Sequence, residues 1–431
     1  MILMCRMNME EIKKLGILTM NNWKRNITLF LMSQTISLFG SALVQYAIMW
    51  HITLTTQSGL MMTLYILCGF LPTFFLSPFA GVWADRYNRK WLIAIADGMI
   101  AFSTLILAIL FLMGYESIWL LFVIAAIRAF GTGIQTPAVG AILPQIVPEE
   151  KLLKVNGING IIQAANTFVA PMVSAALLSL ATLEVIFFID VVTASIAIFT
   201  LLFFLKINVH EKATEKQVGY MEDFKAGIQY IRDQPFLKSF FLFFALMFFL
   251  LAPISFLTPL QVARSFGDDV WRLTVIELTF SIGMMFGGGV ITAWGGFQNR
   301  IHTMVFAGVI ISICTIAIGI VPNFWLYGML MVICGIALPI FNTPTTVLIQ
   351  EKVDGNYLGR IFGVFGMISS SMMPIGMLVF GPLADALAIE WILIITGSLM
   401  LLLVVLLGQN QLLLEAGISK KVNSKGNPSF E

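Results

Sequence analysis

The sequence predicts an all-α membrane protein in which twelve transmembrane helices form two six-helix bundles. Of its 431 residues, 58% are hydrophobic and only 11% are charged, whereas soluble domains average about 45–50% and 25%. Apolar runs also recur along the whole chain, and each is near the ~20 residues that cross a hydrocarbon core. A weak internal repeat, described below, divides these runs into two sets.

The predicted spans are residues 27–54, 59–84, 91–113, 118–143, 157–180, 185–205, 236–262, 273–294, 303–321, 324–349, 358–383 and 392–407. They define five parts of the chain: a tail (1–25), a first bundle (26–206), a linker (207–235), a second bundle (236–408) and a second tail (409–431). The first twenty residues lack the apolar core and cleavage site of a signal peptide, so we expect them to be a tail.

The distribution of cations predicts the orientation. Nearly all of the 25 Lys and Arg residues fall in the two tails and in alternate links between spans. Only Arg264 and Arg272 fall on the opposite side, and Arg128 lies inside a span. Because cytoplasmic loops carry the excess of Lys and Arg, both termini are expected in the cytoplasm of a cell-membrane protein.

The linker is predicted to contain a short amphipathic helix. From Met221 to Arg232 the apolar residues follow helical spacing, which is typical of a helix lying on the inner membrane face. A disordered tether is the alternative, because residues 211–217 are strongly polar.

The two halves share a degenerate repeat. Thr136-Pro137 recurs as Thr343-Pro344, and several residues that follow each pair also correspond. A parallel repeat of six plus six helices encloses a central site near the membrane midplane in many transporters. The correspondence is incomplete, since Gly295–Arg300 lacks the acidic residue found in Ala84–Arg89.

A charged link follows the second span. It is predicted as a tight cytoplasmic loop of six residues between runs 59–84 and 91–113. Its charged residues are Asp85, Arg86, Arg89 and Lys90, and Gly81 lies four residues before Asp85. This pattern resembles the loop 2–3 signature of the major facilitator superfamily, with Asn88 where the family usually has glycine. The resemblance implies the major facilitator fold, and a gate in which Asp85 meets the positive N-terminus of helix 11. A simple positive-inside anchor is the alternative.

Arg128 is predicted to face the protein interior and to have a partner, because an isolated cation in a span costs at least ~2.5–3.5 kcal/mol. Arg128-Ala-Phe-Gly131-Thr-Gly133 resembles the helix-4 motif of proton-coupled members of the superfamily. Its glycines would permit close helix packing. A purely structural ion pair is the alternative reading.

Three carboxyl groups also lie in predicted spans. A carboxyl group in apolar surroundings is a plausible proton carrier, and Asp190 and Glu277 lie toward the outer ends of their spans. Arg128, Asp190 and Glu277 are therefore the predicted proton-coupling residues. Asp97 lies nearer the inner end, and we expect it to belong to the charged loop network. Hydrated, interfacial acids are the alternative for each.

The sequence contains no motif for an ATP, metal or cofactor site. There is no phosphate-binding Gly-Lys loop, the three histidines are scattered, and the cysteines (Cys5, Cys68, Cys314 and Cys334) have no paired spacing. We therefore expect no ATP site, metal, disulfide, cofactor, enzymatic activity or nucleic-acid partner. Met and Phe are abundant, as in adaptable drug sites, although most must face lipid or fill the core. The predicted substrate contacts are Gln34, Gln45, Trp50, Gln163, Asn166 and Asn342.

The order of motifs most resembles the macrolide-efflux branch of the drug:proton antiporters. The residues that carry this resemblance include Asn22-Trp-Lys-Arg, Phe70-Leu-Pro72, Val147-Pro-Glu-Glu-Lys-Leu, Ile276-Glu-Leu-Thr-Phe, Phe341-Asn-Thr-Pro and Tyr357-Leu-Gly-Arg. Helix 5 departs from the antiporter pattern, since Pro171 remains but the surrounding glycines are replaced. The resemblance implies export of a bulky, amphipathic antibiotic in exchange for protons by rocking of the two halves. We expect the protein to be a monomer. The alternatives are a facilitator or importer of a native metabolite or lipid, and a nontransporting membrane sensor or scaffold.

Overall fold

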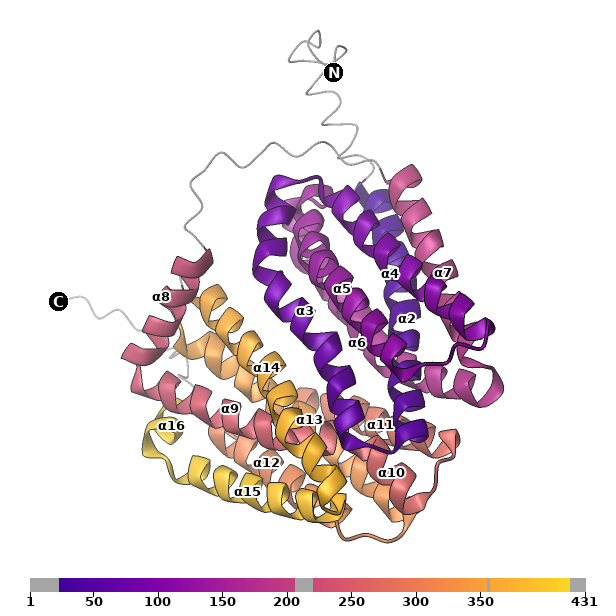
Figure 1. Ribbon diagram of the computed structural model, residues 1–431. Helices are drawn as coiled ribbons and strands as arrows, with labels where there is room; N and C mark the ends of the chain where they lie inside the picture. The colour runs from indigo at the N-terminus through magenta and orange to yellow at the C-terminus, as the bar shows by residue number, and fades with distance from the viewer. Residues whose placement is uncertain (1–22, 206–219, 355–356, 419–431) are drawn as a thin grey trace, which may run out of the picture. The chain divides into compact units, whose positions relative to one another are not determined.

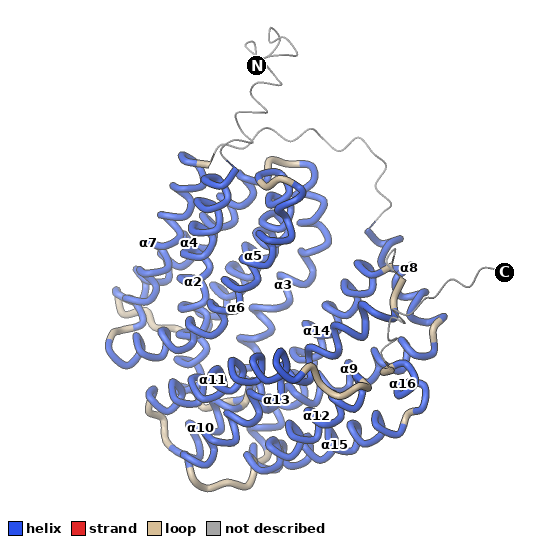
Figure 2. The backbone as a smooth tube through the Cα atoms, turned by 180° about the vertical axis from the view of Figure 1, so that it is seen from behind, coloured by secondary structure: helices blue, strands red, loops and turns tan. Residues whose placement is uncertain are grey.

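The computed structural model describes residues 23–205, 220–354 and 357–418 (Figure 1). Within these ranges the chain folds into helices joined by short loops, as the backbone trace in Figure 2 makes plain. Twelve stretches of helix are long and apolar enough to cross a membrane. The predicted all-α fold with twelve spans is therefore confirmed.

Contacts between Cα atoms divide the chain into two compact units. The first holds the helices α2 (Trp23–Thr56), α3 (Gly59–Arg86), α4 (Arg89–Leu112), α5 (Ile118–Ile146), α6 (Glu149–Leu180) and α7 (Leu183–Phe199), with the π-helical turn η2 (Thr200–Phe204). Here α4 packs against both α5 and α7, and α2 packs against both α6 and α7. Four helices, α2, α4, α5 and α7, thus surround one polar centre, described below.

The second unit follows the linker and holds most of the remaining helices. They are α8 (Tyr220–Asp233), α9 (Pro235–Phe256), α10 (Thr258–Phe266), α11 (Val270–Trp294), α12 (Arg300–Ile318), α13 (Phe324–Lys352), α14 (Leu358–Ala386), α15 (Ile389–Gln409) and α16 (Gln411–Ala416). Within it α12 packs on α13 and α15, and α14 packs on α9.

Several boundaries differ from the prediction, and the largest shift is at α6, which begins at Glu149 where the predicted span begins at residue 157. The link between α3 and α4 is only Tyr87–Asn88, because the Asn88 side chain accepts a hydrogen bond from the Lys90 amide and starts α4 at Arg89. The expected helix 236–262 is also interrupted, at Leu257 between α9 and α10. Pro259 explains the interruption, since proline lacks an amide hydrogen and its ring clashes with the carbonyl one turn earlier.

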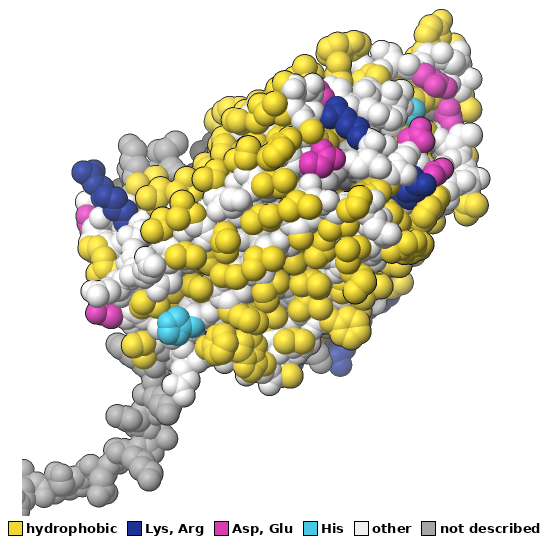
Figure 3. Space-filling model, turned by 90° about the horizontal axis from the view of Figure 1, so that it is seen from below, with side chains coloured by type: hydrophobic (Ala, Val, Ile, Leu, Met, Phe, Trp, Pro, Cys, Tyr) yellow, Lys and Arg dark blue, Asp and Glu magenta, His cyan; other side chains and the backbone are white. Residues whose placement is uncertain are grey.

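The surface of the helices is strongly apolar. Large side chains such as Phe75, Phe102 and Met285 are more than 60% exposed, at 66%, 64% and 67% respectively. Hydrophobic side chains cover most of the face drawn in Figure 3, and charged side chains are sparse on it. In water such a surface would drive aggregation, whereas lipid tails solvate it readily.

The linker helix α8 is packed against other helices. It packs against α14 and α9 in the second unit. The rings of Tyr230 and Tyr357 stack with centroids 4.5 Å apart, and a Cβ added to Gly227 would lie 3.3 Å from the Arg360 Cβ. The helix predicted from Met221 to Arg232 is thus present, with one face against protein.

Candidate functional site

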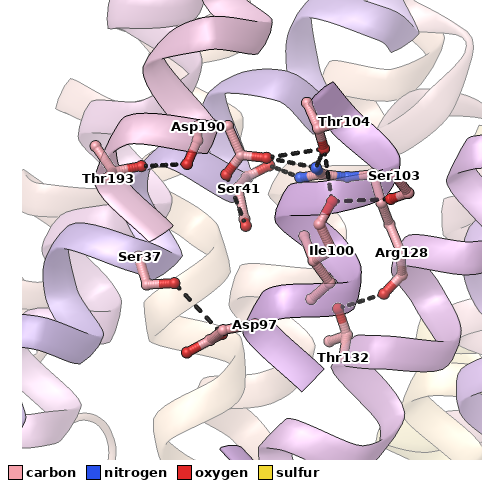
Figure 4. A network of polar contacts seen from close by, with 10 residues as sticks. All are labelled: Ser37, Ser41, Asp97, Ile100, Ser103, Thr104, Arg128, Thr132, Asp190 and Thr193. Atoms are coloured by element: carbon pink, nitrogen blue, oxygen red, sulfur yellow. Dashed lines mark hydrogen bonds and ion pairs between the residues drawn. The ribbon is translucent and has the colours of Figure 1, made fainter. Parts of the chain in front are cut away.

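A buried ion pair joins α5 and α7 inside the first unit (Figure 4). Arg128 Nη1 lies 2.5 Å from Asp190 Oδ2, and the Asp190 side chain has no exposed surface. Arg128 Nη2 donates to the Ser41 carbonyl at 3.0 Å. Asp190 also accepts hydrogen bonds from the hydroxyls of Ser41 and Thr104, each at 3.1 Å. The partner that the sequence predicts for Arg128 is therefore Asp190, and both charged groups are hydrogen-bonded by protein atoms.

Glycines allow the helices around this pair to approach closely. A Cβ on Gly131 would lie 2.6 Å from Ile100 Cγ1 of α4, and one on Gly133 would lie 3.3 Å from the Thr73 Cα of α3. The Thr73 hydroxyl also donates to the Ala129 carbonyl at 2.7 Å. The Arg-x-x-Gly-x-Gly spacing predicts such close helix packing. These contacts place α5 beside α3 and α4.

A second polar layer surrounds Asp97 on α4. This carboxyl group is only 2% exposed. Its Oδ1 accepts hydrogen bonds from Gln135 Nε2 at 2.5 Å and from Ser37 Oγ at 3.4 Å. Gln135 Nε2 also lies 3.5 Å from Gln34 Oε1. The expectation that Asp97 belongs to the charged loop is wrong, because α4 places it about two turns inside the bundle, among neutral polar side chains.

The cations of the α3–α4 link bind helix ends. Arg89 is 9% exposed, and it donates from Nε to the Ala84 carbonyl at 2.8 Å and from Nη1 to the Ala141 carbonyl at 2.7 Å. Lys90 Nζ donates to the carbonyls of Leu202 and Leu205 at 2.9 and 2.8 Å. Such cations satisfy carbonyls that a helix end leaves unpaired. The side chains of Asp85 and Arg86 lie outside the described residues, and Gly81 has open space where a Cβ would be.

The remaining predicted site residues are dispersed. Glu277 is half-buried on α11 and belongs to the second unit, whereas Arg128 and Asp190 belong to the first. Gln34 and Trp50 are buried in the first unit, with exposures of 3% and 0%. The other predicted substrate contacts are half-buried or exposed, namely Gln45, Gln163, Asn166 and Asn342.

A hollow of about 800 Å³ opens between α2 and α6 in the first unit. Its walls are mainly apolar, with Lys24 and Lys151 as the charged residues in the lining. None of the six predicted substrate contacts lines it. Ligand pockets for drug-sized molecules typically measure about 300–1,000 Å³, so this hollow is large enough for a bulky ligand.

Sequence reasoning missed the neutral members of the network. Ser37 and Ser41 lie one turn apart on α2, and Gln135 lies about two turns after Arg128 on α5. A helical face that repeats polar residues at this spacing inside an apolar run was the available signal. Thr104 gave no such signal, because serines and threonines are common inside membrane helices, where they bond to their own backbone.

These features define a polytopic membrane transporter. Residues 26–377 match the family model described as Major Facilitator Superfamily, and the chain belongs to that family. Among its relatives is the macrolide efflux protein A of Streptococcus pyogenes, which is 30% identical over 383 residues, covering 88% of this chain and 95% of that protein. A macrolide efflux protein A of Enterococcus faecalis is 31% identical over 313 residues, covering 72% of this chain and 97% of that protein.

Solved structures agree on the fold. A bacterial homologue of the human lysosomal transporter Spinster, described as inward-facing and unoccupied, aligns with a TM-score of 0.65 at 14% identity, covering 92% of this chain and 97% of that one. The nucleoside transporter NupG aligns with a TM-score of 0.63 at 15% identity, covering 90% and 98%. At these identities the likeness concerns the fold alone.

Proposed function

We propose that this protein is a secondary active exporter that moves bulky, amphipathic, macrolide-like antibiotics across the cytoplasmic membrane in exchange for protons. The observation that carries the proposal is the buried Arg128–Asp190 pair, set in a network of hydrogen bonds within an apolar bundle. Ionisable groups at membrane depth are costly, and transporters retain them where they couple transport to an ion gradient. The similarity to macrolide efflux proteins supports the substrate class.

Transport in this proposal uses alternating access between the two six-helix units, with both termini in the cytoplasm and the protein acting as a monomer. In this proposal Arg128, Asp190 and Glu277 are the charged groups that couple transport to the proton gradient, with Arg128 and Asp190 acting as an ion pair. The apolar hollow between α2 and α6 offers one surface for the substrate. The polar or aromatic contacts proposed from the sequence do not line that hollow and would act elsewhere on the transport path; they are Gln34, Gln45, Trp50, Gln163, Asn166 and Asn342.

The cytoplasmic gate in this proposal is the segment from Gly81 to Lys90, which comprises the end of α3, the α3–α4 link and the start of α4. Arg89 and Lys90 fix the geometry of the link by binding the carbonyls of Ala141 and Leu205. Asp85 is the gating carboxylate that engages a helix N-terminus when the cytoplasmic side closes. Arg86 provides a neighbouring charge in the same latch.

Accumulation of radiolabelled erythromycin tests the export proposal. Energised cells that express the protein should retain several-fold less label than cells without it, and a protonophore should abolish the difference. The variant Arg128→Ala should behave like the empty control at equal protein abundance. Higher accumulation on expression would instead support the importer, and unchanged accumulation across a panel of antibiotics would reject export.

A further inference from the structure

The two buried carboxyl groups of the first unit have different surroundings. Both oxygens of Asp190 accept hydrogen bonds, and its charge is balanced by Arg128 at 2.5 Å. Asp97 has neutral neighbours: Ser37 and Gln135 donate to Oδ1, and the side-chain amide of Gln34 also interacts with the carboxyl group. Its Oδ2 is buried and accepts no hydrogen bond from any residue in the described part of the chain. The charge of Asp190 is therefore compensated by a cation in this structure, and that of Asp97 is not.

The helices packed around Asp97 bring no cation to it. On α2 the charged residues Lys24 and Arg25 are exposed in the first turn, and His51 lies toward the opposite end of the helix. On α5 the Arg128 guanidinium is bonded to Asp190, Thr104 and the Ser41 carbonyl.

The other charges near this layer do not compensate Asp97 either. On α7 the acids are Glu184, in the first turn, and Asp190, whose like charge would oppose ionisation of Asp97. On α4 itself Arg89 and Lys90 donate to helix-end carbonyls. Among the described residues, Asp97 forms no ion pair.

The two layers are joined through shared helices. Asp97 and Thr104 lie about two turns apart on α4, as do Arg128 and Gln135 on α5. Helix α4 thus carries Asp97 and also Thr104, which donates to Asp190. Helix α5 carries Gln135, which donates to Asp97, and Arg128, which pairs with Asp190. A change in charge at Asp97 acts directly on the helices that hold the ion pair.

We propose that Asp97 is the site that binds the exchanged proton, and that the Arg128–Asp190 pair stays ionised beside it. An unpaired carboxylate in a buried site is costly, and binding one proton to Oδ2 forms an O–H bond and removes the charge. The neutral carboxyl group can then donate to an amide oxygen, and Gln34 Oε1 and the rotatable Gln135 amide are the adjacent acceptors. Loss of the proton to water on the other side of the membrane restores the carboxylate.

By contrast, a proton on Asp190 would leave the Arg128 cation buried without its partner, which is strongly unfavourable in a protein interior. This argument assigns the static role to Asp190 and the exchanging role to Asp97. The inference rests on the proposed function, because it specifies the coupling site of the same antiport.

Infrared difference spectroscopy of the purified full-length protein tests proton binding without any substrate. A pH titration should show the carbonyl stretch of a protonated buried carboxyl group, and Asp97→Asn should remove that band. Ser103→Ala is the matched control, since Ser103 is a buried α4 residue whose hydroxyl donates to the Ile100 carbonyl of its own helix. A band that persists in Asp97→Asn would overturn the inference.

Proteoliposomes then test coupling. The variant Asp97→Asn resembles the protonated state. Its uptake of radiolabelled erythromycin driven by a pH difference should be at least tenfold lower than that of the wild type, whereas its exchange of labelled for unlabelled erythromycin should be unchanged. Asp97→Glu keeps a carboxyl group and should recover part of the gradient-driven uptake. This variant therefore tests the inference even if Asp97→Asn folds poorly. Gradient-driven uptake by Asp97→Asn at the wild-type level would refute this inference alone. If vesicles with the wild-type protein show no erythromycin flux, the proposed function is refuted, and the infrared experiment then decides whether Asp97 binds the proton.

Discussion

Arg128 Nη1 and Asp190 Oδ2 lie 2.5 Å apart although the two residues are 62 positions apart in the chain. The contact links the middle of α5 to α7 and draws in Thr104 of α4 and Ser41 of α2. Four helices thus share one charged centre. Because lipid offers no alternative partner to either charge, this pair constrains how the first unit packs.

Breaking the pair should destabilise the protein more than removing it. Arg128→Gln or Asp190→Asn alone leaves a buried charge unpaired, so each should lower the free energy of unfolding by about 3–5 kcal/mol. The double variant should recover part of this loss, because neither charge then remains. Thermal unfolding in detergent, followed by size-exclusion chromatography, measures the effect. Strictly additive losses would show that the two residues do not interact.

The second unit depends on a close contact between α11 and α13. A Cβ on Gly287 would lie 2.3 Å from the Ile336 carbonyl oxygen, which is backbone and cannot move aside alone. Gly287→Ala should therefore cost about 1–3 kcal/mol, a typical penalty for overpacking.

The matched control for Gly287 is the next residue. Gly288→Ala meets nothing within 4 Å and also improves helix propensity, so it should be neutral or slightly stabilising. Thermal unfolding of the two variants side by side checks the contact, and equal melting temperatures would contradict it.

Arg89 should affect folding as well as transport. It satisfies the carbonyls of Ala84 and Ala141, and Arg89→Gln would leave at least one of these buried acceptors unpaired. The expected loss is about 1–3 kcal/mol, with lower abundance in the membrane.

A gating role predicts a different result for Asp85. Asp85→Asn should reduce erythromycin export at least tenfold while leaving the melting temperature within error of the wild type. A drop in stability as large as that of Arg89→Gln would argue that Asp85 is structural.

Helix α8 should detach from α14 when its aromatic contact is removed. The stacked rings of Tyr230 and Tyr357 are worth about 0.5–1.5 kcal/mol beyond the area they bury. Tyr230→Ala should therefore raise amide hydrogen exchange across α8 while exchange in α12 stays unchanged. Tyr230→Phe keeps the stack and serves as the control. Faster exchange in both variants would assign the anchoring to the hydroxyl group instead.

The amino-acid sequence by itself determined the class of protein. Hydropathy is a local property matched to the thickness of the bilayer, so twelve spans could be counted without any knowledge of their neighbours. The motifs around Asp85 and Arg128 indicated the family, and the insertion cost of Arg128 required a partner. Local signals placed the linker helix at nearly its observed position and missed the break at Leu257 and the early start of α4.

Only the tertiary structure decided which acid pairs with Arg128 and which remains alone. Asp97, Asp190 and Glu277 all lie inside apolar spans, and the sequence favoured Asp190 and Glu277 as coupling residues while assigning Asp97 to the charged loop. Their surroundings depend on the rotation of each helix about its axis and on close approaches such as that at Gly131. Because those rotations follow from packing between helices distant in sequence, the uncompensated carboxyl group at Asp97 and its donor Gln135 emerged only when the helices were assembled.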